Sequence, residues 1–211
     1  TDPALDFLPY GLTAPFCNPP FAEHNRIDDA ELVASWFEGI SCCREMLGTN
    51  KGADVEEALG HLLLNQGWDA ASGLRFPTRR PWTPDLDYVL VPEMAAVLSA
   101  LNRLCQASPG DKLAEKRAAG LVAGLAACVV ETKQRFAGFG IFDVEDSCRM
   151  FPGDVFVQGK GFVPGVGTGF SDWMVRCCTL IAPLVRRHLI AGDPVALELA
   201  TGLANTITSV S

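Results

Sequence analysis

The feature that most constrains the fold is a repeated arrangement in which one long apolar helix pattern runs into a second through a very short junction. The three junctions are rich in glycine and aspartate, and they lie at residues 48–54, 108–111 and 192–194. A connection of a few residues can only return the chain alongside itself, so each pair of helices must pack as an antiparallel hairpin. The sequence therefore predicts an all-α fold built from helical hairpins.

The three hairpins are expected at residues 28–66, 90–136 and 171–210 of a single domain, or fragment of one, that covers residues 1–211. Apolar residues recur within them at the spacing of one helix face. The second helix of each hairpin opens with an acidic residue suited to cap its free backbone N–H groups. These expected caps are Asp54, Asp111 and Asp193.

Several residues inside the helix patterns carry further expectations. The helix that opens at Asp111 should continue to about Phe136, because alanine and leucine predominate along it. Gly120 and Gly124 lie one turn apart and should allow another helix to approach closely. Pro183 lies well inside the fifth helix, where its missing N–H should kink or split that helix.

The connections between hairpins, residues 67–88 and 137–170, are long and rich in aromatic residues, glycine, proline and acids. Short extended pieces are expected in the second connection, and a turn around Ser72 and Gly73 in the first. Both connections should lie at one end of the molecule, here called the loop end, and the short junctions at the opposite turn end. Because loops carry function more often than tight turns, a site is expected at the loop end.

The charge balance excludes some partners. The 211 residues include 25 acids and 17 bases, which gives a formal net charge of -8. Such a chain repels phosphate backbones and anionic membrane surfaces, so neither nucleic acid nor a membrane is an expected partner. No run of apolar residues is long enough to span a bilayer. The chain begins with Thr1, and we expect it to be a trimmed product or a piece of a longer polypeptide.

Six of the eight cysteines fall inside helix patterns, where we expect them to pack as small apolar residues. They are Cys42, Cys43, Cys105, Cys128, Cys177 and Cys178. Reduced thiols indicate a reducing compartment, and hence a cytoplasmic location. Cys17 and Cys148 lie in loop patterns, and a contact between them stays open.

Helical hairpins with short turns at one end and long loops at the other resemble the (α/α)6 toroid, a double ring of six hairpins. The stretch from Asp28 to Gly73 is similar to uncharacterised glycosidase-like toroid proteins; it includes Asp-Asp-Ala-Glu-Leu-Val-Ala-Ser-Trp-Phe-Glu-Gly and Leu-Leu-Leu-Asn-Gln-Gly-Trp-Asp-Ala-Ala-Ser-Gly. Three hairpins would form half of such a ring. The resemblance implies that the other half is absent or supplied by another chain, and that the substrate cleft lies over the amino-terminal ends of the first, third and fifth helices.

The residues near those helix starts suit carbohydrate chemistry. Sugar cleavage needs one protonated acid, one ionised carboxylate, and aromatic rings that stack on sugar faces. We therefore expect a glycoside hydrolase-like enzyme that uses no cofactor, with catalytic acids Asp29, Asp87 and Asp172. The expected substrate-binding residues are His24, Arg26, Arg79, Trp82, Tyr88, Glu93 and Trp173.

Other interpretations of the same residues stay open. An aspartate at a helix start can serve only as a cap. The three histidines have no zinc-ligand spacing, so no metal site is expected, and the glycines at 159–169 lack the order of a phosphate-binding loop. Two alternative functions remain: a terpenoid-cyclase-like toroid, suggested by the Gln66-Gly67-Trp68 sequence, and a non-catalytic helical-repeat module that binds another protein.

Overall fold

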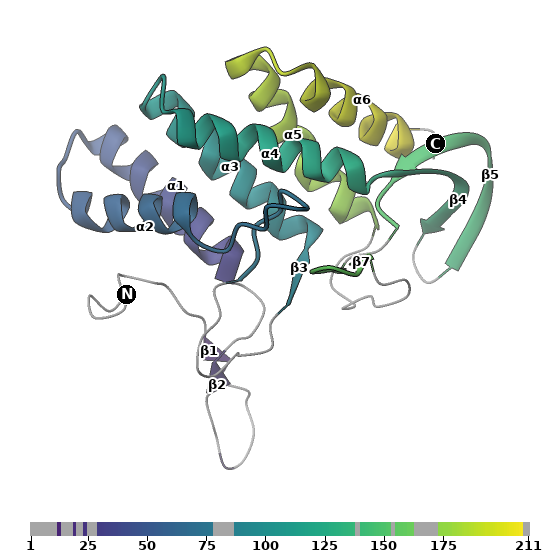
Figure 1. Cartoon of the computed structure of the whole chain (residues 1–211), viewed down its shortest axis with the longest axis horizontal. Helices are drawn as coiled ribbons and strands as arrows, with labels where there is room; N and C mark the ends of the chain where they lie inside the picture. The colour runs from purple at the N-terminus through teal and green to yellow at the C-terminus, as the bar shows by residue number, and fades with distance from the viewer. Residues whose placement is uncertain are drawn as a thin grey trace.

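The computed structural model describes residues 12–13, 19, 23–24, 29–77, 87–137, 140–152, 155–162 and 173–208. Over these residues the protein is all-α with short β pieces in its connections, as predicted (Figure 1). The helices are α1 (Asp29–Leu47), α2 (Ala53–Asn65), α3 (Val91–Ala107), α4 (Lys112–Cys128), α5 (Trp173–Ala191) and α6 (Pro194–Thr208).

The helices pair as three hairpins, α1–α2, α3–α4 and α5–α6. Two of the expected acidic caps are confirmed. The Asp111 carboxylate accepts hydrogen bonds from the N–H groups of Leu113 and Ala114 at 2.9 and 3.1 Å, and Asp193 caps α6 in the same way. The expected cap at Asp54 is wrong, because α2 begins one residue earlier and Gly52, in the left-handed conformation, takes the cap position.

The hairpins stack so that the helices form two layers. The first layer holds α1, α3 and α5, with α3 packed between the other two, and the second holds α2, α4 and α6 (Figure 1). The core lies between the layers and is built from aliphatic side chains of both. Fully or almost fully buried examples are Leu62, Leu98, Leu121, Leu184 and Leu203.

The predicted extent of the second hairpin is wrong at its carboxyl end. The fourth helix ends at Cys128, and residues Val130–Ala137 form strand β4, which pairs antiparallel with β5 (Gly140–Met150). The alanine-rich run that favours helix ends at Cys128, and the β-branched residues Val129 and Val130 come next. Pairing with β5 then supplies hydrogen-bond partners for the backbone of the following residues, so local helix preference beyond them is overridden.

The fifth helix was expected to be kinked or split at Pro183. The split is wrong, because α5 is one continuous helix from Trp173 to Ala191, and the kink stays a prediction. The carbonyl oxygen of Pro183 accepts a hydrogen bond from the buried Asn102 side chain of α3 at 2.8 Å. This bond ties α5 to α3 at the proline. Pro183 therefore lies at a helix contact rather than at a helix end.

The remaining strands are short. They are β1 (Leu12–Thr13), β2 (Glu23–His24), β3 (Tyr88–Leu90), β6 (Val155–Val157) and β7 (Gly161–Phe162). Strands β3, β6 and β7 form one antiparallel sheet in that order. The extended pieces expected in the second long connection are therefore confirmed, although β5 is longer than expected.

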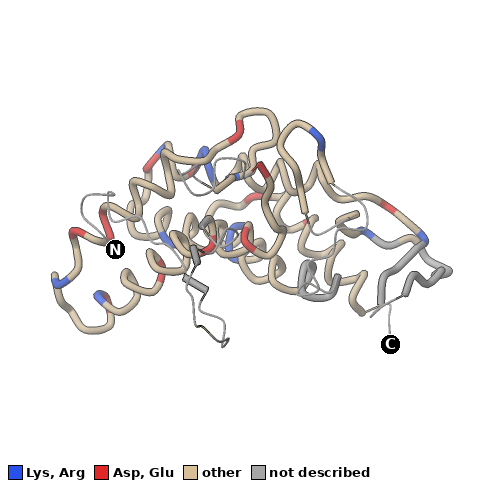
Figure 2. Tube along the Cα trace, turned by 90° about the horizontal axis from the view of Figure 1, so that it is seen from below, with Lys and Arg blue, Asp and Glu red and all other residues tan. Residues whose placement is uncertain are grey.

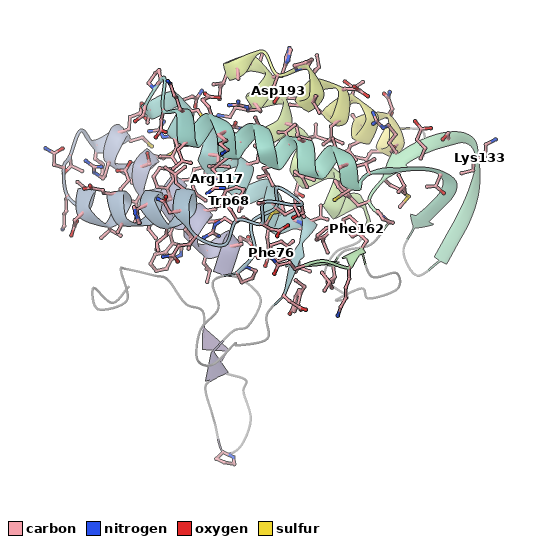
Figure 3. All side chains as sticks on the ribbon, in the orientation of Figure 1. Trp68, Phe76, Arg117, Lys133, Phe162 and Asp193 are labelled. Carbon is pink, nitrogen blue, oxygen red and sulfur yellow. The ribbon has the colours of Figure 1, made fainter. Side chains whose placement is uncertain are left out.

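A buried cation holds the turn end together. Arg187 of α5 is almost fully buried, and its Nη2 donates to the Glu115 carboxylate of α4 at 2.5 Å. Its Nε lies 3.8 Å from the carboxylate of Asp193, which Figure 3 places far from Phe76 and Phe162. The hydrogen bond from Arg187 lowers the pKa of Glu115, while burial raises the pKa of the neighbouring Cys105 thiol to about 11.

The helical cysteines whose side chains the structure describes are free thiols, as predicted: Cys42, Cys43, Cys105, Cys128 and Cys178. Their expected role as packing residues is confirmed for Cys105, which is buried, but is wrong for Cys43 and Cys178, which are exposed. Cys17 lies outside the described residues, so its contact with Cys148 stays a prediction.

Candidate functional site

The two long connections meet at the loop end. Strand β3, at the end of the first connection, pairs with β6 of the second. The Gln158 side chain donates from Nε2 to Oδ1 of Asp69 at 3.0 Å, and the rings of Phe76 and Phe156 lie 6.3 Å apart. Residues 67–77, 87–90 and 155–162 therefore lie together at the loop end, whereas the β4–β5 hairpin extends away from them and packs on α6 (Figure 1).

The first connection begins with a tight turn that Asp69 organises. One carboxylate oxygen of Asp69 accepts hydrogen bonds from the N–H and the hydroxyl of Ser72, both at 2.7 Å. The backbone N–H of Asp69 donates a hydrogen bond to the carbonyl oxygen of Leu74 at 3.0 Å, and this bond closes the turn. The bonds from Ser72 and then Gln158 lower the pKa of Asp69. Asp69 is therefore ionised at neutral pH and acts as a structural acceptor.

Trp68 anchors the same turn to the helices. Its indole N–H donates to the carbonyl oxygen of Leu63 at 2.8 Å, and the Arg117 guanidinium lies 4.9 Å from its ring centroid (Figure 3). Arg117 also donates to the carbonyl oxygen of Leu64 at 2.9 Å, so one side chain joins α4 to the end of α2. Trp68 is therefore a structural residue of the turn.

Glycines bring the turn into direct contact with α4. A Cβ atom on Gly124 would lie 2.1 Å from the carbonyl oxygen of Ser72, and one on Gly73 would lie 2.5 Å from that of Gly120. The expected close approach of a helix at Gly120 and Gly124 is wrong, because Gly124 admits the 69–74 turn instead and a Cβ atom added at Gly120 would meet nothing within 4 Å. Only glycine allows two backbones to come this near.

A groove of about 610 Å³ lies between this turn, the second half of α4 and the β6–β7 turn. Its walls are mostly backbone and small side chains, with one carboxylate, one thiol and one aromatic ring. The lining residues are Asp69, Ala70, Ala71, Ser72, Gly73, Gly120, Ala123, Gly124, Ala127, Cys128, Phe156, Gly159 and Gly161. Burial raises the pKa of Cys128 to about 11, so this thiol is protonated and a poor nucleophile.

Three of the predicted site residues have described side chains. Asp87 precedes β3, Tyr88 is its first residue, and Glu93 lies in the first turn of α3. The carbonyl oxygen of Asp87 accepts a hydrogen bond from the N–H of Gln158 at 2.7 Å, and the residue is half-buried. Tyr88 is also half-buried and pairs with Val157. Glu93 is only 2% exposed, and its Oε2 accepts a hydrogen bond from the N–H of Leu90 at 3.1 Å. Glu93 therefore closes the first turn of α3.

The other predicted residues are placed only in part. Asp29 is the first residue of α1, Trp173 is the first residue of α5, and His24 lies in β2, but the structure describes only their backbones. The starts of α1, α3 and α5 lie on the same side of the molecule (Figure 1). The remaining predicted residues fall outside the described ranges, namely Arg26, Arg79, Trp82 and Asp172.

Sequence reasoning did not select the residues that build the groove. Asp69 and Ser72 have the spacing of an aspartate-capped turn, which could have marked Asp69 as an organising residue. The contact between Gln158 and Asp69 spans 89 positions, so nothing local signals it. Arg75, which follows the turn and is fully buried, also had no sequence signal, because a buried arginine depends on its tertiary surroundings.

Over the described ranges, no group of three or more histidine, cysteine, aspartate or glutamate residues is placed to hold a metal ion. The helices described here include none with the length and apolarity to cross a membrane. Lysine and arginine are interspersed with acids along the described trace and form no continuous basic stripe there (Figure 2). No family model, curated protein or solved structure gives a match to the chain.

Proposed function

We propose that the loop end binds a carbohydrate and that the protein is a glycoside hydrolase-like enzyme with the hairpin arrangement of a partial (α/α)6 toroid. The observation that carries the proposal is the meeting of the two long connections over a groove of about 610 Å³. This volume falls within the range of roughly 300–1,000 Å³ that is usual for small-molecule sites. The turn end offers a smaller hollow of about 330 Å³ between paired charges.

The groove chemistry suits a polyhydroxylated ligand. Glycine-rich walls leave backbone N–H and C=O groups within reach, and the ionised Asp69 can accept hydrogen bonds from sugar hydroxyls. Phe156 gives the groove one aromatic surface, and its ring is held from behind by Phe162, which it meets edge to face at 5.3 Å. The proposal also includes a reducing, cytoplasmic setting, which the free thiols support.

In the catalytic form of the proposal, Asp29, Asp87 and Asp172 supply the acid and base. The test replaces each with asparagine, which keeps the shape and most of the capping, and measures hydrolysis of a panel of glycosides. We expect loss of turnover by about 100-fold or more for at least one replacement, the scale of general acid–base catalysis. Asp54→Asn at the turn end is the matched control and should hydrolyse like the parent. Unchanged turnover in all three variants would remove these acids from the mechanism.

A second candidate is a non-catalytic module that binds a ligand at the loop end. It is favoured by the roles of Asp69 and Glu93, whose carboxylates bind backbone groups and hold a turn and a helix start. Under this alternative, the parent binds a sugar without hydrolysing it, and the three asparagine variants bind as the parent does. Parallel measurements of binding and turnover distinguish the two candidates.

The terpenoid-cyclase alternative draws no support from the described residues. Trp68 is held by Leu63 and Arg117 as part of the turn. The groove is lined mainly by small residues, with Phe156 as its aromatic member, whereas a cavity for hydrocarbon cations would need several rings.

A further inference from the structure

Among the residues that the structure describes, helix α1 packs against neighbours on two of its faces, and no described helix or strand covers the third, here called the open face. Toward α3, Glu38 accepts a hydrogen bond from Ser99 at 2.9 Å, and Ser41 accepts one from Arg103 at 3.0 Å. Toward α2, Phe37 lies against Gly60. The open face points away from α3 and forms the free edge of the first helix layer.

The open face of α1 is apolar from Leu32 to Leu47. Uncharged residues follow one another along it at the spacing of one helix face, namely Leu32, Trp36, Gly39, Cys43 and Leu47. Trp36 is 44% exposed, Leu47 is 76% exposed and Cys43 is also exposed. A Cβ atom added at Gly39 would meet nothing within 4 Å, so the middle of this face is a notch. A face of this kind is unusual for a helix that borders only water.

Helix α5 presents a similar face at the other edge of the same layer. Its contacts to α3 run through Pro183 and Arg187. The opposite side of α5 carries a row of exposed residues at helical spacing, namely Cys178, Ala182, Val185 and Leu189. The side chain of Leu189 is 77% exposed. The neighbouring Arg186 turns toward α3 and donates to Gln106 at 2.6 Å, so this edge is also uncharged.

The two edges complement each other in spacing and size. Both helices have 19 residues and start at the loop end. Counted from the helix starts, the α1 residues occupy positions 4, 8, 11, 15 and 19, and the α5 residues occupy positions 6, 10, 13 and 17. The two series alternate when the helices lie parallel and in register. Each side chain of one face would then enter a gap of the other, as in ordinary helix packing.

Residue size follows the same alternation. The large Trp36 falls between the small Cys178 and Ala182, and the small Gly39 and Cys43 receive the larger residues of α5, Val185 and Leu189. A head-to-tail contact also extends the order α1–α3–α5 that already exists within one chain. Packing of α1 on α1 would instead leave the α5 faces exposed, so it explains the apolar face of α1 but not that of α5.

We propose that the protein associates with a second copy of itself through a parallel contact between α1 of one copy and α5 of the other. Such a contact is heterologous, because different surfaces of the two copies meet. Its central side chain is Trp36, since a large aromatic residue entering a pocket of small residues is the usual centre of an interface. The inference is independent of the carbohydrate proposal, because neither edge includes the groove.

The test is sedimentation velocity of the full chain over a wide concentration range. The parent should show reversible, concentration-dependent association. Trp36→Glu and Leu189→Glu each place a carboxylate in the contact, and each should weaken association by about 30-fold or more. Ala119→Glu on the exposed side of α4 is the matched control, and it should associate like the parent. Leu47→Glu provides a second α1 variant if Trp36→Glu does not fold.

Mixing the two variants distinguishes this contact from a symmetric one. Trp36→Glu retains an intact α5 edge and Leu189→Glu retains an intact α1 edge, so the mixture should form a one-to-one complex with the affinity of the parent, although each variant alone associates about 30-fold or more weakly. A parent that stays monomeric at all concentrations would overturn the proposal. So would a Leu189→Glu variant that associates like the parent, because that result requires an interface without α5.

Discussion

The contact between Gly124 and the 69–74 turn makes a quantitative prediction about stability. In Gly124→Ala, the new Cβ atom would lie 2.1 Å from the carbonyl oxygen of Ser72, whereas ordinary contact begins near 3.4 Å. The turn must therefore move by roughly 1.3 Å, although it is held by the bond from Gly73 N–H to the Asp69 carbonyl oxygen at 2.9 Å. Overpacking of this kind costs about 1–3 kcal/mol, and a clash with backbone favours the upper part of that range.

Gly120→Ala is the matched control, because it lies one turn earlier in α4 and its added Cβ atom would meet nothing within 4 Å. Both replacements gain about 1 kcal/mol of helix propensity, so this gain cancels when the two variants are compared. We expect Gly124→Ala to be less stable than Gly120→Ala by about 1–3 kcal/mol in urea unfolding. For a chain of this size, each kcal/mol shifts Tm by about 2–4 °C. Equal stability of the two variants would refute the close approach of turn and helix.

Three further predictions follow from other contacts. The pKa of Asp69 in the folded protein is lowered below its ordinary value of 3.8, so the stability that this carboxylate contributes is present above pH 3.8 and is lost as the pH falls through the folded-state pKa. In Asp69→Asn, the free energy of unfolding measured with urea should therefore fall less steeply with decreasing pH than in the parent. Cys43 and Cys178 should react with iodoacetamide in dilute native protein while the buried Cys105 stays unmodified, as peptide mass spectrometry would show, and fast labelling of Cys105 would contradict the packing of α3. Arg187→Met should lower the free energy of unfolding by about 1 kcal/mol, since it removes the hydrogen bond from a buried guanidinium to a carboxylate that solvent partly screens, and an unchanged value would mean that the pair contributes little.

The sequence was most informative where a local signal and the tertiary structure agree. Helix α1 spans Asp29–Leu47 as its apolar spacing and its closing glycine predict. The hairpins follow from the length of the junctions, because a short connection forces the second helix to run back antiparallel to the first. The layered all-α fold could therefore be predicted without knowledge of any contact.

Prediction failed where distant residues decide the structure. Residues after Cys128 form a strand because β5 pairs with them, and no local pattern reports that partner. The groove could not be predicted for the same reason, since Asp69 and Gln158 are brought together by the pairing of β3 with β6. Glu93 was expected to bind substrate, which stays a prediction; its position three residues after Leu90 could also have indicated the bond that it accepts from the Leu90 N–H at the start of α3.

The most direct test of a ligand site at the loop end is amide NMR of the labelled protein titrated with a panel of carbohydrates. The structure predicts saturable shift changes at residues 69–73 and 156–161, with smaller changes near Asp87, and none at the Gly48–Gly52 junction. Saturable changes at the turn end, or the absence of any saturable change at residues 69–73 and 156–161, would contradict the assignment of function to the loop end.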